Sequence, residues 1–206
     1  MANRTAATAT RPRGRPRNSN GQETAARLVE AAAQTCAEHG FEGATLSAIA
    51  RRAGVTPAAI YNHFESREEL LYAAGVARLQ QVTDVVPADA GADAARLIAA
   101  AYLRPEQAQT RRLLAELHLA GGRDPRLAEL LAAWHQSWAR TLLTVLPADD
   151  PHPEATVKAL FLVLLGLCHL DHLEAVAVDP AALADRVRAM VDVLVPPRKD
   201  RRRRRW

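Results

Sequence analysis

The chain has 206 residues, a net charge of +4 and 49% apolar residues, enough for one or two domains with a buried core. Its two cysteines, Cys36 and Cys168, exclude a disulfide framework and favour a reducing, cytoplasmic setting. The longest apolar run, residues 159–168, is too short to cross a membrane, and the charged N-terminus lacks the apolar stretch of a signal peptide.

Positive charge is concentrated at the two ends of the chain. Residues 1–20 carry five arginines and no acid, and residues 196–206 carry a net +6, which leaves −7 for residues 21–195. Because neither end has apolar periodicity, we expect a disordered basic arm over 1–20 and a disordered basic tail over 196–206. A basic segment on an acidic body is a common layout for a nucleic-acid-binding arm.

Between the ends, apolar residues recur at helical spacing, and caps and breakers divide the chain into helices. Thr45 and Thr56 fit N-cap positions, Ser66-Arg67-Glu68-Glu69 has the pattern of a capping box, and Gly40 and Gly54 fit helix ends. We expect about nine helices, over residues 22–39, 46–53, 57–64, 66–82, 93–103, 106–120, 124–146, 154–176 and 180–195. No segment has a convincing strand pattern, so the predicted fold class is all-α.

Residues 45–64, TLSAIARRAGVTPAAIYNHF, combine two short helices with a tight turn at Ala53-Gly54-Val55. Ile49 and Ile60 are spaced to pack the two helices together, which is the layout of a helix-turn-helix. The outer face of the second helix carries small and polar residues, and these let a helix approach base edges closely. The segment therefore predicts a DNA-reading element; a small helical bundle with a tight turn is the alternative.

The surrounding residues, FEGATLSAIARRAGVTPAAIYNHFESREELLYA (41–73), closely resemble the N-terminal domain of TetR-family transcriptional regulators, and the resemblance covers about residues 22–75. It implies a three-helix DNA-binding domain over 21–66, followed over 67–195 by a larger helical domain that binds a small ligand and dimerises. It also places DNA contacts at Thr45, Thr56, Pro57, Ala58, Tyr61 and His63.

Two neighbouring positions complete the expected interface. Arg67 stands where the family often has a phosphate-binding lysine, and Asn62 can contact a base or a phosphate. The sequence departs from a typical reading helix at Ala58 and Ala59, which offer no hydrogen bonds to bases. Base specificity would then depend on thymine methyl contacts, on Asn62, or on the arm.

The arm contains Pro12-Arg13-Gly14-Arg15-Pro16, which is similar to the core of an AT-hook. A glycine lets the backbone approach the floor of the minor groove, where arginines find enhanced negative potential. We expect Arg13, Arg15 and Arg17 to contact the minor groove of A·T-rich DNA; a solvated leader is the alternative. The run Arg201–Arg205 lies far from the reading element in sequence and is interpreted as a solvated tail.

In the larger domain, aromatic and polar side chains at helical spacing indicate a small-molecule pocket. The candidate ligand-binding residues are Tyr102, His118, Trp134, Trp138, Phe161 and His172; core packing or a dimer surface is the alternative for each. Cys168, His169, Asp171 and His172 also invite a metal site, to which His118 or His135 could contribute. We favour a polar patch at a dimer interface and expect neither a metal nor a cofactor.

Dimerisation is expected through residues 154–176, which are apolar on nearly every side, and the amphipathic residues 180–195. Two-fold symmetry then implies a palindromic operator, so the predicted function is that of a ligand-responsive repressor. The alternative is an architectural protein that binds DNA through its basic tails, and no catalytic motif supports an enzyme. The effector, the operator and the choice between repressor and activator stay open.

Overall fold

The computed structural model describes residues 17–87, 89–170 and 178–196. These residues form nine α-helices and two short 3₁₀ helices, Gly91–Asp93 and Pro105–Gln107, and none of them is in a β-strand. The predicted all-α fold class is confirmed. No helix in the described part of the chain is long and apolar enough to cross a membrane.

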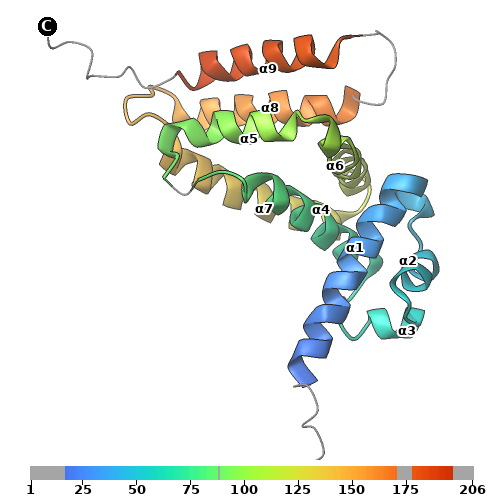
Figure 1. Cartoon of the computed structure of the whole chain (residues 1–206). Helices are drawn as coiled ribbons and strands as arrows, with labels where there is room; N and C mark the ends of the chain where they lie inside the picture. Colours follow the sequence, from blue (N-terminus) through green and yellow to red (C-terminus); the bar gives the residue numbers. More distant parts are fainter. Residues whose placement is uncertain (1–16, 88, 171–177, 197–206) are drawn as a thin grey trace, which may run out of the picture.

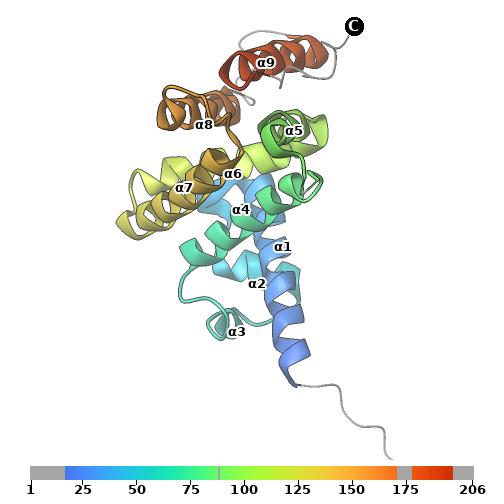
Figure 2. The ribbon, with the colours of Figure 1, turned by 90° about the vertical axis from the view of Figure 1, so that its left-hand side faces the viewer.

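Helices α1 (Arg17–Gly43), α2 (Leu46–Ala53) and α3 (Pro57–Ile60) form the N-terminal end of the molecule, with α2 and α3 together beside α1 (Figures 1 and 2). Gly54 ends α2 with a φ of 67°, a left-handed conformation that favours glycine and turns the chain sharply towards α3. The two short helices and this turn form the expected helix-turn-helix.

Six helices form the body: α4 (Arg67–Thr83), α5 (Ala94–Tyr102), α6 (Ala108–Gly121), α7 (Pro125–Val145), α8 (Pro153–Leu170) and α9 (Pro180–Leu194). Figure 2 shows α9 at one end of the molecule and α3 at the other, with α4 and α6 between them. Helix α9 packs against α5 and α8, whereas α1 packs against α4 and α6.

One hydrophobic core joins the helix-turn-helix to the body. Leu28 of α1 and Ile60 of α3 belong to the same buried cluster as Leu117 of α6 and Leu127 of α7, and all four are 1% exposed or less. A second cluster, which includes Val191, lies between α5, α7, α8 and α9. Because the first core is shared, the position of the reading helices depends on the packing of α4 and α6.

Three helix boundaries differ from those expected. Helix α1 begins at Arg17 and not near Gln22, because residues 17–21, RNSNG, contain no apolar residue that periodicity could detect. At its other end, Gly40 (φ 71°, ψ 177°) interrupts the helix as expected, but a further turn follows to Gly43. Helix α3 ends at Ile60 and not near residue 64, because the chain tightens there, with His63 N–H donating to the Ile60 carbonyl at 2.9 Å. Of the helix expected over 154–176, residues 171–176 lie outside the described residues.

Helix α4 approaches α6 closely at Gly75, where a Cβ atom would lie 2.5 Å from Cδ1 of the buried Leu117. We expect Gly75→Ala to lower the free energy of unfolding by about 1–3 kcal/mol, because the buried Leu117 side chain or the two helices must shift to make room. Thermal denaturation measures this loss. The matched control is Gly21→Ala in α1, where a Cβ meets no atom within 4 Å and alanine favours the helix. Equal effects at both glycines would contradict close packing at Gly75.

Candidate nucleic-acid interface and ligand cavity

Threonine hydroxyls cap the two helices of the helix-turn-helix. Thr45 Oγ1 accepts a hydrogen bond from the Ala48 N–H at 3.2 Å, and Thr56 Oγ1 accepts one from the Ala59 N–H at 3.3 Å. Both N-cap predictions are thereby confirmed. Each hydroxyl keeps its own proton for donation to a phosphate.

The residues predicted to contact DNA mostly form an exposed surface. Thr45, Thr56, Pro57, Ala58 and Asn62 are exposed, Tyr61 is 59% exposed, and His63 is half-buried. Ile49 and Ile60, on the opposite sides of the same helices, are fully buried. The two short helices thus attach to the molecule through their apolar sides and leave a face of small and polar groups for a partner. Contact of these residues with DNA stays a prediction.

Arg67 is engaged within the protein. Its Nη1 donates to the Phe41 carbonyl and its Nε to Glu68, both at 2.9 Å, and its guanidinium lies 4.5 Å above the Phe41 ring. A phosphate would have to compete with these bonds, so the structure favours a positioning role for this side chain. Arg13 and Arg15 lie outside the described residues, and Arg17 is described only as the first residue of α1.

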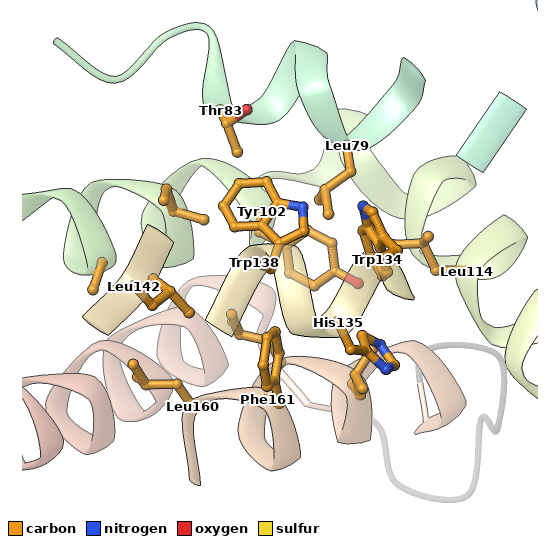
Figure 3. A pocket seen from close by; sticks show the side chains of 14 residues that line it. Leu79, Thr83, Tyr102, Leu114, Trp134, His135, Trp138, Leu142, Leu160 and Phe161 are labelled. Atoms are coloured by element: carbon orange, nitrogen blue, oxygen red, sulfur yellow. The ribbon is translucent and has the colours of Figure 1, made fainter. Parts of the chain in front are cut away.

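A cavity lies inside the body, between α4, α5, α6, α7 and α8 (Figure 3). Its empty volume is about 630 Å³, part of which is open to solvent. The aromatic and polar residues that line it are Thr83, Tyr102, Trp134, His135, Trp138 and Phe161, and the other lining residues are aliphatic. A mostly apolar cavity with a few polar groups between helices is the usual form of a small-molecule site.

Four of the six candidate ligand residues line this cavity: Tyr102, Trp134, Trp138 and Phe161. His118 does not line it but lies behind His135, and His172 lies outside the described residues. The sequence prediction missed His135 as a lining residue, although it follows Trp134 directly. Its position beside the aromatic stripe of α7 was the signal that could have found it.

His118 and His135 form a hydrogen-bonded pair whose proton positions follow from their partners. His118 Nδ1 lies 2.6 Å from the Leu114 carbonyl oxygen, which can only accept, so this nitrogen carries the proton of the neutral ring. His118 Nε2 is then an acceptor, and His135 Nε2–H donates to it at 3.1 Å. Both imidazoles are neutral in this arrangement.

Burial keeps the pair neutral. It lowers the pKa of His135 to about 4, and the electrostatic influence of the neighbouring His118 and Lys158 lowers it further. It also lowers the pKa of His118, against the hydrogen bond to Leu114, which raises it. Nowhere in the described part of the chain do three or more His, Cys, Asp or Glu side chains lie close enough to hold a metal ion.

The exposed helix-turn-helix and the body around a cavity together define a class, that of helix-turn-helix DNA-binding proteins with a helical second domain. Residues 28–74 match the model of the bacterial regulatory proteins of the tetR family. An uncharacterized HTH-type transcriptional regulator of Mycobacterium tuberculosis is 28% identical over 157 residues, which cover 71% of this chain and 79% of that protein.

Solved structures share the fold. A transcriptional regulator from Rhodococcus sp. Rha1 has a TM-score of 0.70 at 21% identity and covers 82% of this chain and 95% of its own. The multidrug binding protein EbrR, complexed with imidazole, has a TM-score of 0.64 at 25% identity, and the match covers 92% of this chain and 100% of the EbrR chain. The N-terminal domain of the chain, over residues 28–74, thus matches the tetR family of bacterial regulatory proteins, and the similar curated proteins are HTH-type transcriptional regulators.

The low pKa of His135 makes the stability of the protein depend on pH. The pKa is about 4 in the folded chain and near 6.5 when unfolded, so between these values the unfolded chain alone binds the proton. The free energy of unfolding is expected to fall as the pH is lowered from about 6.5 to about 4, and the loss is complete below that range. His135→Gln should flatten this dependence, which urea denaturation at several pH values measures. His39→Gln, which removes an exposed imidazole, is the control; a parallel loss in both variants would contradict the assignment.

Proposed function

We propose that the chain is a ligand-responsive repressor that binds a palindromic operator as a homodimer and is released from it by a small molecule. The observation that supports this most is the aromatic cavity, whose walls include α4 and α6, the helices that pack against α1. A relative of the same fold, EbrR, carries the description of a multidrug binding protein in its complex with imidazole. The domains proposed are those expected from the sequence, 21–66 for DNA and 67–195 for ligand and dimer.

Exposed apolar side chains on α8 and α9 support the homodimer. Leu162 is 66% exposed, Met190 51% and Val193 80%, whereas Val187 and Val191 of α9 face inward and are buried. Helix α9 therefore has a second apolar stripe beyond the one that packs on the body. Burial of these side chains against a second copy would remove them from water, which is favourable in proportion to the apolar area covered.

The main chain of Phe41 offers a route from the cavity to the reading helices. Its N–H donates to Glu116 of α6 at 3.2 Å, and its carbonyl accepts from Arg67 of α4. We call these three residues the Phe41 junction. Helix α6 also lines the cavity through Leu114, and α4 lines it through Leu79. A ligand that shifts either helix would move the end of α1 and the helix-turn-helix attached to it.

Sequence-specific binding is tested by footprinting the purified protein on DNA upstream of its own gene, at two salt concentrations. We expect a protected palindrome that survives moderate salt and a roughly tenfold loss of affinity in Tyr61→Ala, whose side chain is exposed and contributes little to stability. Gln136→Ala, an exposed residue of α7, is the control. Diffuse protection that is lost with salt in both variants would favour the architectural alternative.

The Phe41 junction is tested by Glu116→Ala. Loss of the bond to the Phe41 N–H lets the reading helices take other orientations, so operator affinity should fall by about fivefold or more in proportion to the competent fraction. Fluorescence anisotropy with the operator measures the affinity. Glu129→Ala, an exposed position on α7, removes the same charge and is the control. An equal change in both variants would mean that charge alone acts and that the junction does not orient the reading helices.

A further inference from the structure

The walls of the cavity carry no ionic group. Of the fourteen described residues that line it, none is Asp, Glu, Lys or Arg. The nearest buried cation, Arg111, donates to the carbonyl oxygens of Tyr102 and Arg104. A charged ligand would therefore lose its hydration and gain no ion pair, which is unfavourable.

The hydroxyl and imidazole groups of the walls already donate their protons to hydrogen bonds within the protein. His135 donates its Nε2–H to His118, and Thr83 Oγ1 donates to the Gln80 carbonyl at 2.9 Å. The Tyr102 hydroxyl is bonded to Cys168 Sγ, which itself donates to the Leu164 carbonyl at 3.6 Å, so the tyrosine is the donor of the pair. Apart from the indole N–H groups, these side chains can only accept a further hydrogen bond.

His135 Nδ1 is the nitrogen of the histidine pair that is left to accept a hydrogen bond from a ligand. Its ring borders the cavity, and Nδ1 has no hydrogen-bond partner among the described residues. The centroids of the Trp134 and Phe161 rings lie 5.1 and 5.4 Å from that of His135. Figure 3 shows the Tyr102 ring between His135 and Trp138. Flat aromatic surfaces beside this acceptor match a flat ligand with one donor.

Aromatic walls could also attract a cation, but the surroundings oppose one. The desolvation and the Lys158 charge that lower the pKa of His135 would act in the same way on a cationic ligand. A cation–π contact contributes less than the loss of hydration when no carboxylate is near.

We propose, on the basis of the function proposed above, that the cavity binds an uncharged aromatic molecule that donates a hydrogen bond to His135 Nδ1. The hydroxyl of a phenol or the N–H of an indole has this chemistry. Selection follows from two properties of the walls, the absence of ionic groups and the hydrogen bonds that already use the protons of Thr83, Tyr102 and His135.

The test is isothermal titration calorimetry of the full chain with four naphthalene probes at neutral pH. 2-Naphthol should bind, naphthalene about tenfold more weakly because it lacks the donor, and 2-naphthoate and 2-naphthyltrimethylammonium at least a hundredfold more weakly. His135→Phe keeps a ring but removes the acceptor, so it should abolish the preference for 2-naphthol over naphthalene. Gln136→Ala, an exposed position of α7 that does not line the cavity, is the control and should retain that preference.

Equal binding of a charged probe, no binding of any probe, or a preference that survives in His135→Phe would overturn the proposal. If His135→Phe does not fold, His135→Gln replaces it and should weaken the preference. The footprint on DNA needs no ligand, so its failure is separate from these outcomes. Binding of 2-naphthol without any change in operator protection would support the ligand class and contradict the ligand response.

Discussion

The orientation of the reading helices depends on the Phe41 junction, where three helices meet at one residue. Gly40 takes a positive φ that breaks the run of α1, and this break leaves the Phe41 N–H free to reach Glu116 rather than a carbonyl of its own helix. Arg67 binds the Phe41 carbonyl and covers its ring. Removal of Glu116 would leave the Phe41 N–H without its bond, and removal of Arg67 would leave the Phe41 carbonyl only the bond from the Ala44 N–H, at 3.3 Å. Both changes fall close to the start of α2 at Leu46.

The shared hydrophobic core couples movement at this junction to the helix-turn-helix. Because Leu28 and Ile60 pack in the same cluster as Leu117, the helix-turn-helix cannot tilt without repacking against α6. Close-packed interiors respond to displacement by switching between discrete arrangements, not by gradual deformation. A ligand in the cavity therefore needs to stabilise only one alternative position of α4 or α6 to change the presentation of α3, provided that it binds the two arrangements unequally.

Local signals in the sequence were sufficient where short-range chemistry decides the structure. The caps at Thr45 and Thr56 depend on residues three positions away, and the all-α class follows from periodicity. Tyr102, Trp134 and Phe161 come together as the pattern indicated. The sequence could not reveal the bonds of Arg67 or the contact of His135 with His118, because these contacts join different helices and depend on how the helices pack. The sequence also did not predict that α3 ends at Ile60. That end depends on the hydrogen bonds that the N–H groups of residues 62–64 make with the Ala59 and Ile60 carbonyls.

The reading domain carries few positive charges that are free to attract DNA phosphates. Residues 21–80 contain five arginines and seven glutamates, and four of the arginines are engaged within the protein: Arg27 with the Ala53 carbonyl, Arg52 with Glu38, Arg67 with Glu68 and Arg78 with Glu30. Arg51 is exposed and has no ion pair within the described part of the chain. Electrostatic attraction of this domain to DNA phosphates is accordingly weak. The five arginines of residues 1–20 can supply additional attraction. When non-specific attraction to phosphates is small, affinity for an operator depends on the fit of α3 to the major groove. A coupling free energy of about 1–3 kcal/mol between ligand binding and DNA binding is then enough to change the occupancy of the operator severalfold or more.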